Sequence, residues 1–310
     1  MVQRDVTVVI PTRDRPDELR TAVRSALSQR AVELEIVVVD DASTDPAHVV
    51  LDELADRRIR VVRNPGPLGE TATRNRGIAE ASGSWIAFLD DDDLWSPDKV
   101  THQLDALDLQ DAGWAYAGDV VVDQYLRPVH GAPPPSPEAI ASTLRRYNSV
   151  PAGASNVIVR ASLLEDVGTF DPRLRRTGDW DLWLRLMATG RPACVSEPLV
   201  ANRVHRGNVS KDMDVLFEEL PLIARRHGIP VDVAQHHRWA AWTARLEGHR
   251  WRAIRSYGRA ISHGDLASIG RAAVIAVARH PPVRDPTESD REWLRQAEEW
   301  LRPFTRPSAE

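Results

Sequence analysis

The chain has 310 residues, 42% of them hydrophobic, and a formal net charge of −5 at pH 7. A chain of this length and composition can bury a sizeable core, which excludes a disordered protein and favours one large domain with an appendage, or two domains. The acidic balance argues against a protein that coats nucleic acid, so no nucleic-acid partner is expected. The single cysteine, Cys194, excludes an internal disulfide framework and a zinc site built on cysteines.

The sequence offers no segment that predicts membrane insertion. Its longest apolar run, Ala272–Ala278, is too short to span a bilayer, and Met1–Arg20 is too polar for a signal peptide. We therefore expect a cytoplasmic protein. Residues 215–310 carry 15 Lys and Arg against 12 Asp and Glu, so peripheral contact of this region with the inner face of a membrane stays open as an alternative.

The first half of the chain alternates apolar strands with amphipathic helices. Such a pattern predicts a mainly parallel sheet with helices on both faces, in which ligands bind outside the carboxyl ends of the strands. The expected strands are Val6–Ile10, Glu35–Val39, Ile59–Val62 and Trp85–Leu89, and the expected helices are Asp17–Gln29, Ala47–Ala55 and Glu70–Ala81.

Polar clusters follow three of these strands, at residues 11–13, 40–43 and 90–93. The last is a run of four aspartates, whose mutual repulsion calls for a positive group nearby. Side chains two apart in an extended segment point the same way, so Asp90 and Asp92 could share one hard cation. A solvated acidic turn that caps the following helix is the alternative.

The second half of the chain is less regular. Residues 113–123 predict one or two strands, and the proline-rich stretch 129–137 predicts an exposed loop over the site. The last part predicts only helices, at Val215–His227, Val233–Leu246, Arg250–His263, Leu266–Ala278 and Glu288–Leu301.

Four motifs together carry a family resemblance. They are Val-Ile-Pro-Thr-Arg-Asp-Arg (9–15), Val-Val-Val-Asp-Asp-Ala-Ser-Thr-Asp (37–45), Ala-Thr-Arg-Asn-Arg-Gly (72–77) and Phe-Leu-Asp-Asp-Asp-Asp (88–93). In order and spacing they resemble the signatures of family 2 glycosyltransferases, inverting enzymes of the GT-A fold. The resemblance extends over roughly residues 6–210 and leaves the last hundred uncovered.

The resemblance implies an α/β fold with a mixed, mainly parallel sheet flanked by helices. It implies a catalytic domain at 1–214, with a nucleotide-binding half at 1–95 and an acceptor half at 96–214. The helical spacing of the tail adds a C-terminal helical region at 215–310. The implied reaction is transfer of a sugar from a UDP- or dTDP-sugar to a hydroxyl of a glycan, a lipid-linked sugar or a small molecule. A homodimer formed through the C-terminal helices is a further expectation.

The resemblance also assigns the nucleotide and metal sites. Asp41 matches the carboxylate that reads the base, and Asp90 and Asp92 match the DXD positions that hold Mn²⁺ or Mg²⁺ against the diphosphate. The matching positions expected to contact the nucleotide are Pro11, Thr12, Arg15, Asp41, Arg74 and Asp91.

On the acceptor side, Asp179 matches the family's general base, which takes the proton of the acceptor hydroxyl. Gly178 stands where the family commonly has Glu, which leaves the acceptor class open. Ser155 and Asn156 are expected near the donor sugar, and Trp180 to stack on a sugar or to pack in the core.

The closing segment 202–210 resembles the family's Arg-x-His-x-x-Asn-x-Ser, so Arg203 and His205 are expected to reach the diphosphate, and His205 the metal. Two other functions stay open at this point. One is a nucleotide-sugar-binding protein without transferase activity, and the other is a nucleotidyltransferase, against which the lack of a glycine-rich phosphate loop argues.

Overall fold

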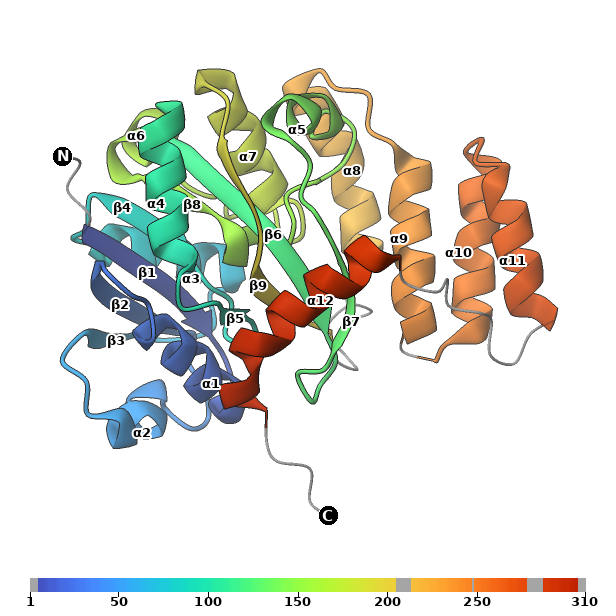
Figure 1. The fold of residues 1–310 in the computed structure, drawn as a ribbon. Coiled ribbons are helices and arrows are strands. Elements are labelled where there is room, and N and C mark those ends of the chain that lie inside the picture. Colours follow the sequence, from blue (N-terminus) through green and yellow to red (C-terminus); the bar gives the residue numbers. More distant parts are fainter. Residues whose placement is uncertain (1–4, 205–212, 247, 278–286, 306–310) are drawn as a thin grey trace, which may run out of the picture.

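The computed structural model describes residues 5–204, 213–246, 248–277 and 287–305, and a nine-stranded sheet lies at its centre (Figure 1). The strand order is β3-β2-β1-β4-β8-β6-β9-β5, with β7 beside β6. The strands are β1 (Asp5–Thr12), β2 (Glu33–Asp40), β3 (Ile59–Arg63), β4 (Trp85–Phe88), β5 (Leu94–Trp95), β6 (Trp114–Val122), β7 (Pro128–Ala132), β8 (Ile158–Arg160) and β9 (Ala193–Arg203).

The N-terminal half of the sheet is parallel, which confirms the prediction. β1 pairs with β2 and with β4, and β2 pairs with β3. Neighbouring residues along β1 face opposite sides, so Val8 and Val9 are both fully buried but belong to different cores. Strands buried on both faces are nearly continuous apolar runs, which is why their sequence could be read so directly.

Helices cover both faces of this sheet. The core on the Val8 face is closed by α1, α2 and α4, and the core on the Val9 face by α5 to α8. These helices are α1 (Pro16–Leu27), α2 (Ala47–Leu51), α4 (Lys99–Gln110), α5 (Pro137–Thr143), α6 (Ala161–Val167), α7 (Gly178–Thr189) and α8 (Met213–His227).

Helix α3 (Glu70–Glu80) packs closely on β1 and β2 through a glycine. A Cβ at Gly77 would lie 2.3 Å from Cγ1 of Val9, so only glycine lets the helix approach the strand this far. The close approach brings the first turn of α3, with Arg74, to the carboxyl edge of the sheet.

The second half of the sheet is mixed. β8 runs antiparallel to both β4 and β6, and β6 runs parallel to β9. The stretch 113–123, predicted to hold one or two strands, holds one, β6. The predicted loop at 129–137 is wrong for most of its length, because residues 128–132 form β7, which pairs with β6, and residue 137 begins α5. Proline is tolerated at the first residue of an edge strand, so its presence there did not exclude a strand.

The C-terminal helices do not form a separate layer. The expected boundary at 214/215 falls inside α8, whose Leu216 and Leu220 share a core with α7. α12 (Glu288–Leu301) runs back across β7 and β9, where Ala297 and Leu301 are buried (Figure 1). Between them, α9 (Val233–Leu246), α10 (Arg250–Ser262) and α11 (Ala267–Val277) stand side by side. Among the described residues, no helix is long and apolar enough to cross a bilayer.

Candidate active site

The four aspartates lie where β4 ends, at the carboxyl edge of the parallel strands. Asp91, Asp92 and Asp93 are buried. The hydroxyl of Thr12, at the end of β1, donates a hydrogen bond to Oδ2 of Asp91 (2.8 Å). The guanidinium of Arg15, just before α1, donates to Oδ1 of Asp91 (2.9 Å) and Oδ2 of Asp92 (2.7 Å). Two motifs that are far apart in the sequence therefore meet, as predicted for parallel strands.

Arg74 holds the other side of the cluster. Its buried guanidinium forms ion pairs with Asp90 and with Glu70 one turn earlier in α3. It also attracts the carboxylate of Asp179, so it lies between the acidic cluster and the candidate base. The close packing of α3 that Gly77 permits is what delivers this arginine.

Asp93 ties the cluster to the acceptor side of the sheet. Its carboxylate accepts hydrogen bonds from Oγ of Ser155 (2.5 Å) and from the backbone N–H of Arg203 (2.9 Å). The antiparallel pair Leu94 with Ala201, between β5 and β9, brings Arg203 to this position. Asp93 is thus a structural support, whereas Arg203 reaches the acidic cluster by its electrostatic contact with Asp92.

Among the described residues, the four aspartates carry more negative charge than Arg15, Arg74 and Arg203 balance. Burial, with repulsion from Asp92, raises the pKa of Asp91 to about 7 despite Arg15 beside it. Burial likewise raises the pKa of Asp90 to about 6 despite Arg74. A divalent cation stabilises the ionised form of buried carboxylates whose pKa is raised in this way.

The donor set fits Mn²⁺ or Mg²⁺ in one particular way. Carboxylate oxygens are the ligands that these hard cations prefer, and Mg²⁺ typically takes one or two of them together with phosphates and water. Within residues 5–204, 213–246, 248–277 and 287–305, no three His, Cys, Asp or Glu side chains lie together so that they could hold a metal ion. The protein's part of a shell would thus be at most two carboxylates, such as Asp90 and Asp92, and a diphosphate and water would complete it.

The loop after β2 is organised by its own aspartates. Oδ1 of Asp41 accepts hydrogen bonds from the amide of Asn64 (2.8 Å) and the N–H of Leu68 (2.8 Å), and Oδ2 accepts from the N–H of Gly69 (3.0 Å). Asp40 pairs with Arg63. Asp41 therefore holds the loop of residues 64–69 in place. Pro11 lies in β1, between the parallel neighbours β2 and β4.

Asp179 lies in the first turn of α7, where its charge faces the positive end of the helix dipole. Its Oδ2 accepts a hydrogen bond from the side-chain amide of Asn148 (2.8 Å), and its Oδ1 accepts one from the N–H of Trp180 (2.7 Å). Burial raises its pKa, and Trp180 and Arg74 oppose that rise. A carboxylate with a raised pKa is suited to accept a proton.

The turn before α7 is fixed from a distance by Glu219 of α8. Its buried carboxylate accepts hydrogen bonds from the N–H groups of Arg175 (2.7 Å), Arg176 (3.0 Å) and Thr177 (2.9 Å), and from the hydroxyl of Thr177 (2.9 Å). Thr177 makes no side-chain cap of its own to α7. Glu219 therefore fixes the start of the helix that carries Asp179.

Two predicted sugar-contacting residues lie behind the site surface. Asn156 is fully buried, and its side chain bonds the N–H and C=O of Ala117 (2.7 and 2.6 Å). Trp180 is 1% exposed, its indole N–H donates to the carbonyl of Leu144, and its ring packs on His236. Both side chains support the acceptor-side turn. Of the remaining predictions, His205 lies outside the described residues.

Sequence reasoning missed Glu70, Asn148 and Glu219 in this site. Glu70 could have been found, because it precedes Arg74 by one helical turn. Asn148 and Glu219 reach Asp179 and its turn across 31 and 42 residues of sequence, and no local pattern predicts such contacts.

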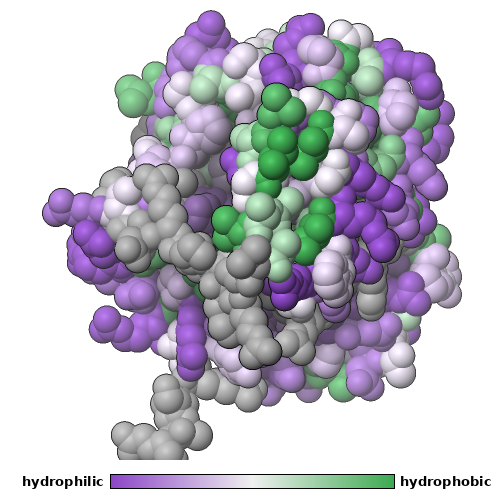
Figure 2. All heavy atoms as spheres, turned by 90° about the vertical axis from the view of Figure 1, so that its right-hand side faces the viewer, coloured by the Kyte–Doolittle hydropathy of each residue, from purple (hydrophilic) through white to green (hydrophobic). Residues whose placement is uncertain are grey.

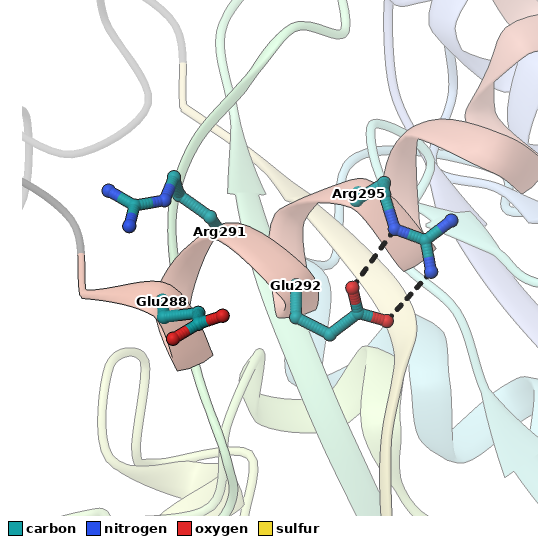
Figure 3. A pocket seen from close by; sticks show the side chains of 4 residues that line it. All are labelled: Glu288, Arg291, Glu292 and Arg295. Carbon is teal, nitrogen blue, oxygen red and sulfur yellow. Dashed lines mark hydrogen bonds and ion pairs between the residues drawn. The ribbon is translucent and has the colours of Figure 1, made fainter.

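A shallow hollow on α12 lies apart from the site (Figure 3). Glu288, Arg291, Glu292 and Arg295 line it, and Arg295 is bonded to Glu292 (3.0 and 2.8 Å). These are exposed charged side chains of a single helix, and none of the predicted site residues is among them. We assign no site to this hollow.

A mainly parallel sheet that ends in a buried acidic loop, with a second carboxylate at a facing helix N-terminus, defines the GT-A class of fold. The sequence profile described as "Glycosyl transferase family 2" matches residues 7–168, which is more than half of the chain. The chain therefore belongs to glycosyl transferase family 2, as the motifs predicted.

Individual relatives agree with this placement. UDP-Glc:alpha-D-GlcNAc-diphosphoundecaprenol beta-1,3-glucosyltransferase WfaP of Escherichia coli is 27% identical over 236 residues, which cover 75% of this chain and 89% of WfaP. The crystal structure of S. aureus TarS 1-349 in complex with UDP-GlcNAc has a TM-score of 0.59 at 17% identity, covering 97% of this chain and 92% of TarS 1-349. Mannosyltransferase PcManGT of Pyrobaculum calidifontis, in complex with GDP-Man and Mn²⁺, has a TM-score of 0.54 at 18% identity, covering 95% of this chain and 86% of PcManGT.

Proposed function

We propose that this protein is a metal-dependent inverting glycosyltransferase that moves a hexosyl group from a nucleoside diphosphate sugar to an acceptor hydroxyl. The observation that carries the proposal is the pair of carboxylate centres joined by Arg74, the acidic cluster on one side and Asp179 on the other. Family membership favours glycosyl transfer over nucleotidyl transfer.

The donor would lie over the carboxyl ends of β1, β2 and β4. We assign Thr12, Arg15 and Asp41, with Pro11, to the nucleotide side, and Arg74 and Asp91 to the ribose and the loop around it. Relatives point to a UDP-sugar, since WfaP is named for UDP-Glc and TarS was crystallised with UDP-GlcNAc. A dTDP-sugar would present the same base edge to Asp41.

Asp90 and Asp92 would hold Mn²⁺ or Mg²⁺, with His205 as a further proposed ligand from outside the described residues. When bound, the cation neutralises the charge that develops on the departing diphosphate. PcManGT, which shares the fold, was solved with Mn²⁺. Arg203, whose backbone N–H bonds Asp93, would place its guanidinium on the same diphosphate.

In the transfer step, Asp179 accepts the proton of the acceptor hydroxyl as that oxygen bonds to the anomeric carbon. The bond from the anomeric carbon to the diphosphate oxygen breaks on the opposite face, and its electron pair leaves with the diphosphate. Attack from the opposite face inverts the configuration at the anomeric carbon. Asn148 donates to Oδ2 of Asp179 and the N–H of Trp180 donates to Oδ1, so the proton would be received at the remaining lone pair of one of these oxygens.

The acceptor is proposed to be a hydroxyl of a sugar in a glycan or a lipid-linked sugar, because WfaP is named for a diphosphoundecaprenol-linked acceptor. Ser155 and Asn156 would shape the donor-sugar pocket from below, and Trp180 would support it through the core. We propose 1–214 as the catalytic unit, with halves at 1–95 and 96–214, and 215–310 as a helical region that buttresses it.

The test combines binding with turnover. UDP binding by calorimetry with Mn²⁺ or with EDTA, and transfer from UDP-Glc to a panel of sugar acceptors, are measured for the wild type and three variants. Asp92→Ala should lose metal-dependent binding, whereas Asp179→Asn should keep it and lose turnover by about 10²- to 10⁴-fold. Asp166→Asn, at an exposed position of α6, is the matched control. Turnover unchanged in both site variants would refute the assignment.

A further inference from the structure

Helix α11 is largely apolar, with Arg271 as its one charged residue, although only one side of it is covered. Ser268 and Ile275 are buried on the side that faces α10. On the outer side, Ile269 and Val274 are 52% and 45% exposed, and Leu266 just before the helix is 69% exposed. Figure 2 shows a stripe of hydrophobic residues on this side of the molecule, with hydrophilic residues along one edge. A contiguous exposed apolar stripe is normally covered by protein or lipid.

The neighbouring helix α10 adds positive charge and an aromatic anchor. Trp251 is 74% exposed, and Arg252 and Arg255 are exposed on the same outer arc of α10, opposite its buried Tyr257. Within the described part of the chain, neither of these two arginines has a carboxylate partner. Arg259 lies beside His237 instead, in a hollow that Asp214 and Glu218 also line.

The one carboxylate between residues 248 and 276 already has partners of its own. Residues 248–276 contain five arginines and a single carboxylate, Asp265. Asp265 is bonded to Arg238 (3.0 Å), to Arg271 (3.5 Å) and to the hydroxyl of Ser268. The outer arc therefore keeps an uncompensated positive charge beside an apolar stripe.

We propose that α10 and α11 form a lipid-docking surface for an anionic bilayer, made of Trp251, Arg252, Arg255, Ile269 and Val274. The apolar side chains of α11 enter the boundary between headgroups and acyl chains, and the arginines lie against the lipid phosphates. Tryptophan favours this boundary because its ring is apolar and its N–H is polar. A second copy of the chain fits less well, since it would present the same unbalanced arginines.

Docking would set the orientation of the active site. α9, on which α10 packs, contacts the catalytic core through His236 on Trp180 (5.5 Å between ring centres) and Trp242 on His130 (6.4 Å). Trp180 follows Asp179 in α7. A bilayer held by α10 and α11 would therefore have a fixed position relative to the candidate base, whichever acceptor the enzyme uses.

The test is flotation of the full chain with vesicles of phosphatidylcholine, alone or mixed with phosphatidylglycerol. We expect binding only to the mixed vesicles, and weaker binding at high salt. The double variant Arg252→Gln/Arg255→Gln should bind about 25-fold more weakly, at about fivefold for each arginine near the surface. The double variant Ile269→Ser/Val274→Ser should lose binding to the mixed vesicles at the salt concentration at which the wild type binds them.

Matched controls lie on the catalytic core. Leu109→Ser removes an apolar side chain that is 86% exposed on α4, and Arg191→Gln removes a side chain that is 68% exposed, so both should bind as the wild type does. The arginine variants change only exposed side chains, so their folding is not in question if the serine variant is unstable. Equal binding to both vesicle types, or none, overturns the proposal. So does a dimer, detected by light scattering, that Ile269→Ser/Val274→Ser dissociates.

Discussion

Glu219 is the residue through which the C-terminal helices should act on catalysis. Its carboxylate binds three successive backbone N–H groups and the hydroxyl of Thr177, two residues before Asp179. Replacing Glu219 by Ala leaves these donors in a poorly hydrated turn. A buried donor left without its partner costs about 1–3 kcal/mol, and water can reach the more exposed Arg175 and Arg176, so we expect a loss of about 3 kcal/mol in unfolding free energy.

This loss should lower the melting temperature by about 5 °C in a chain of this size. Catalysis should fall more steeply than stability, because a displacement of about 1 Å at a catalytic group costs on the order of 10²-fold in rate. The KM for the nucleotide sugar should stay unchanged, since the nucleotide side of the site does not contact Glu219.

The assay is transfer measured well below the melting temperature, with kcat and KM determined separately. Glu218→Ala, at the exposed neighbouring position, is the control for any general effect on α8. The kcat and the melting temperature of Glu219→Gln should lie between those of Glu219→Ala and Glu218→Ala, because the amide NH₂ of the glutamine faces backbone donors that it cannot bond. If Glu219→Ala kept kcat within twofold and melted as the wild type does, the inferred coupling of α8 to Asp179 would be wrong.

Three further predictions follow from the same contacts. Asn148→Ala removes a donor that stabilises the ionised Asp179, so its pKa should rise further and the acid limb of the pH–rate profile of kcat should move to higher pH; an unmoved limb would contradict this. Gly178→Ala should fold and melt as the wild type does, since a Cβ there would meet Thr71 at 3.5 Å and Leu174 at 3.9 Å, both ordinary van der Waals distances; a lower melting temperature would contradict this. Burial, with repulsion from nearby cations, lowers the pKa of His237 from 6.5 to about 4. Between pH 6.5 and about 4, the unfolded chain therefore binds a proton at His237 that the folded chain does not bind. The free energy of unfolding should fall by about 1.4 kcal/mol for each pH unit that the pH drops in this range. Denaturant titrations at several pH values should show a weaker pH dependence for His237→Phe.

The sequence predicted the parallel half of the sheet because two-sided burial makes each strand an apolar run. It also predicted that the ends of β1 and β4 meet, and the bonds of Thr12 and Arg15 to Asp91 agree with that. The C-terminal helices were placed well, because their buried residues recur at helical spacing.

Contacts over long sequence distances were not predictable. β7 was missed because prolines mask an edge strand, and the packing of α12 on β7 and β9 depends on Trp293, whose ring fits beside Gly118 and Gly131. Trp180 could be read as a sugar platform or as core. Only the tertiary structure, with its indole bonded to Leu144, decides between them.

The central claim is that the acidic cluster binds a cation with the donor's diphosphate while Asp179 takes the acceptor proton. Calorimetric titration of UDP into the wild type, Asp92→Ala and Asp179→Asn, each with Mn²⁺ and with EDTA, tests it most directly. The account predicts tight UDP binding only with Mn²⁺ for the wild type and Asp179→Asn, and weak UDP binding for Asp92→Ala under both conditions. In the accompanying transfer assay, it predicts transfer by the wild type alone. Binding of UDP by Asp92→Ala that equals the wild type with Mn²⁺ would contradict it.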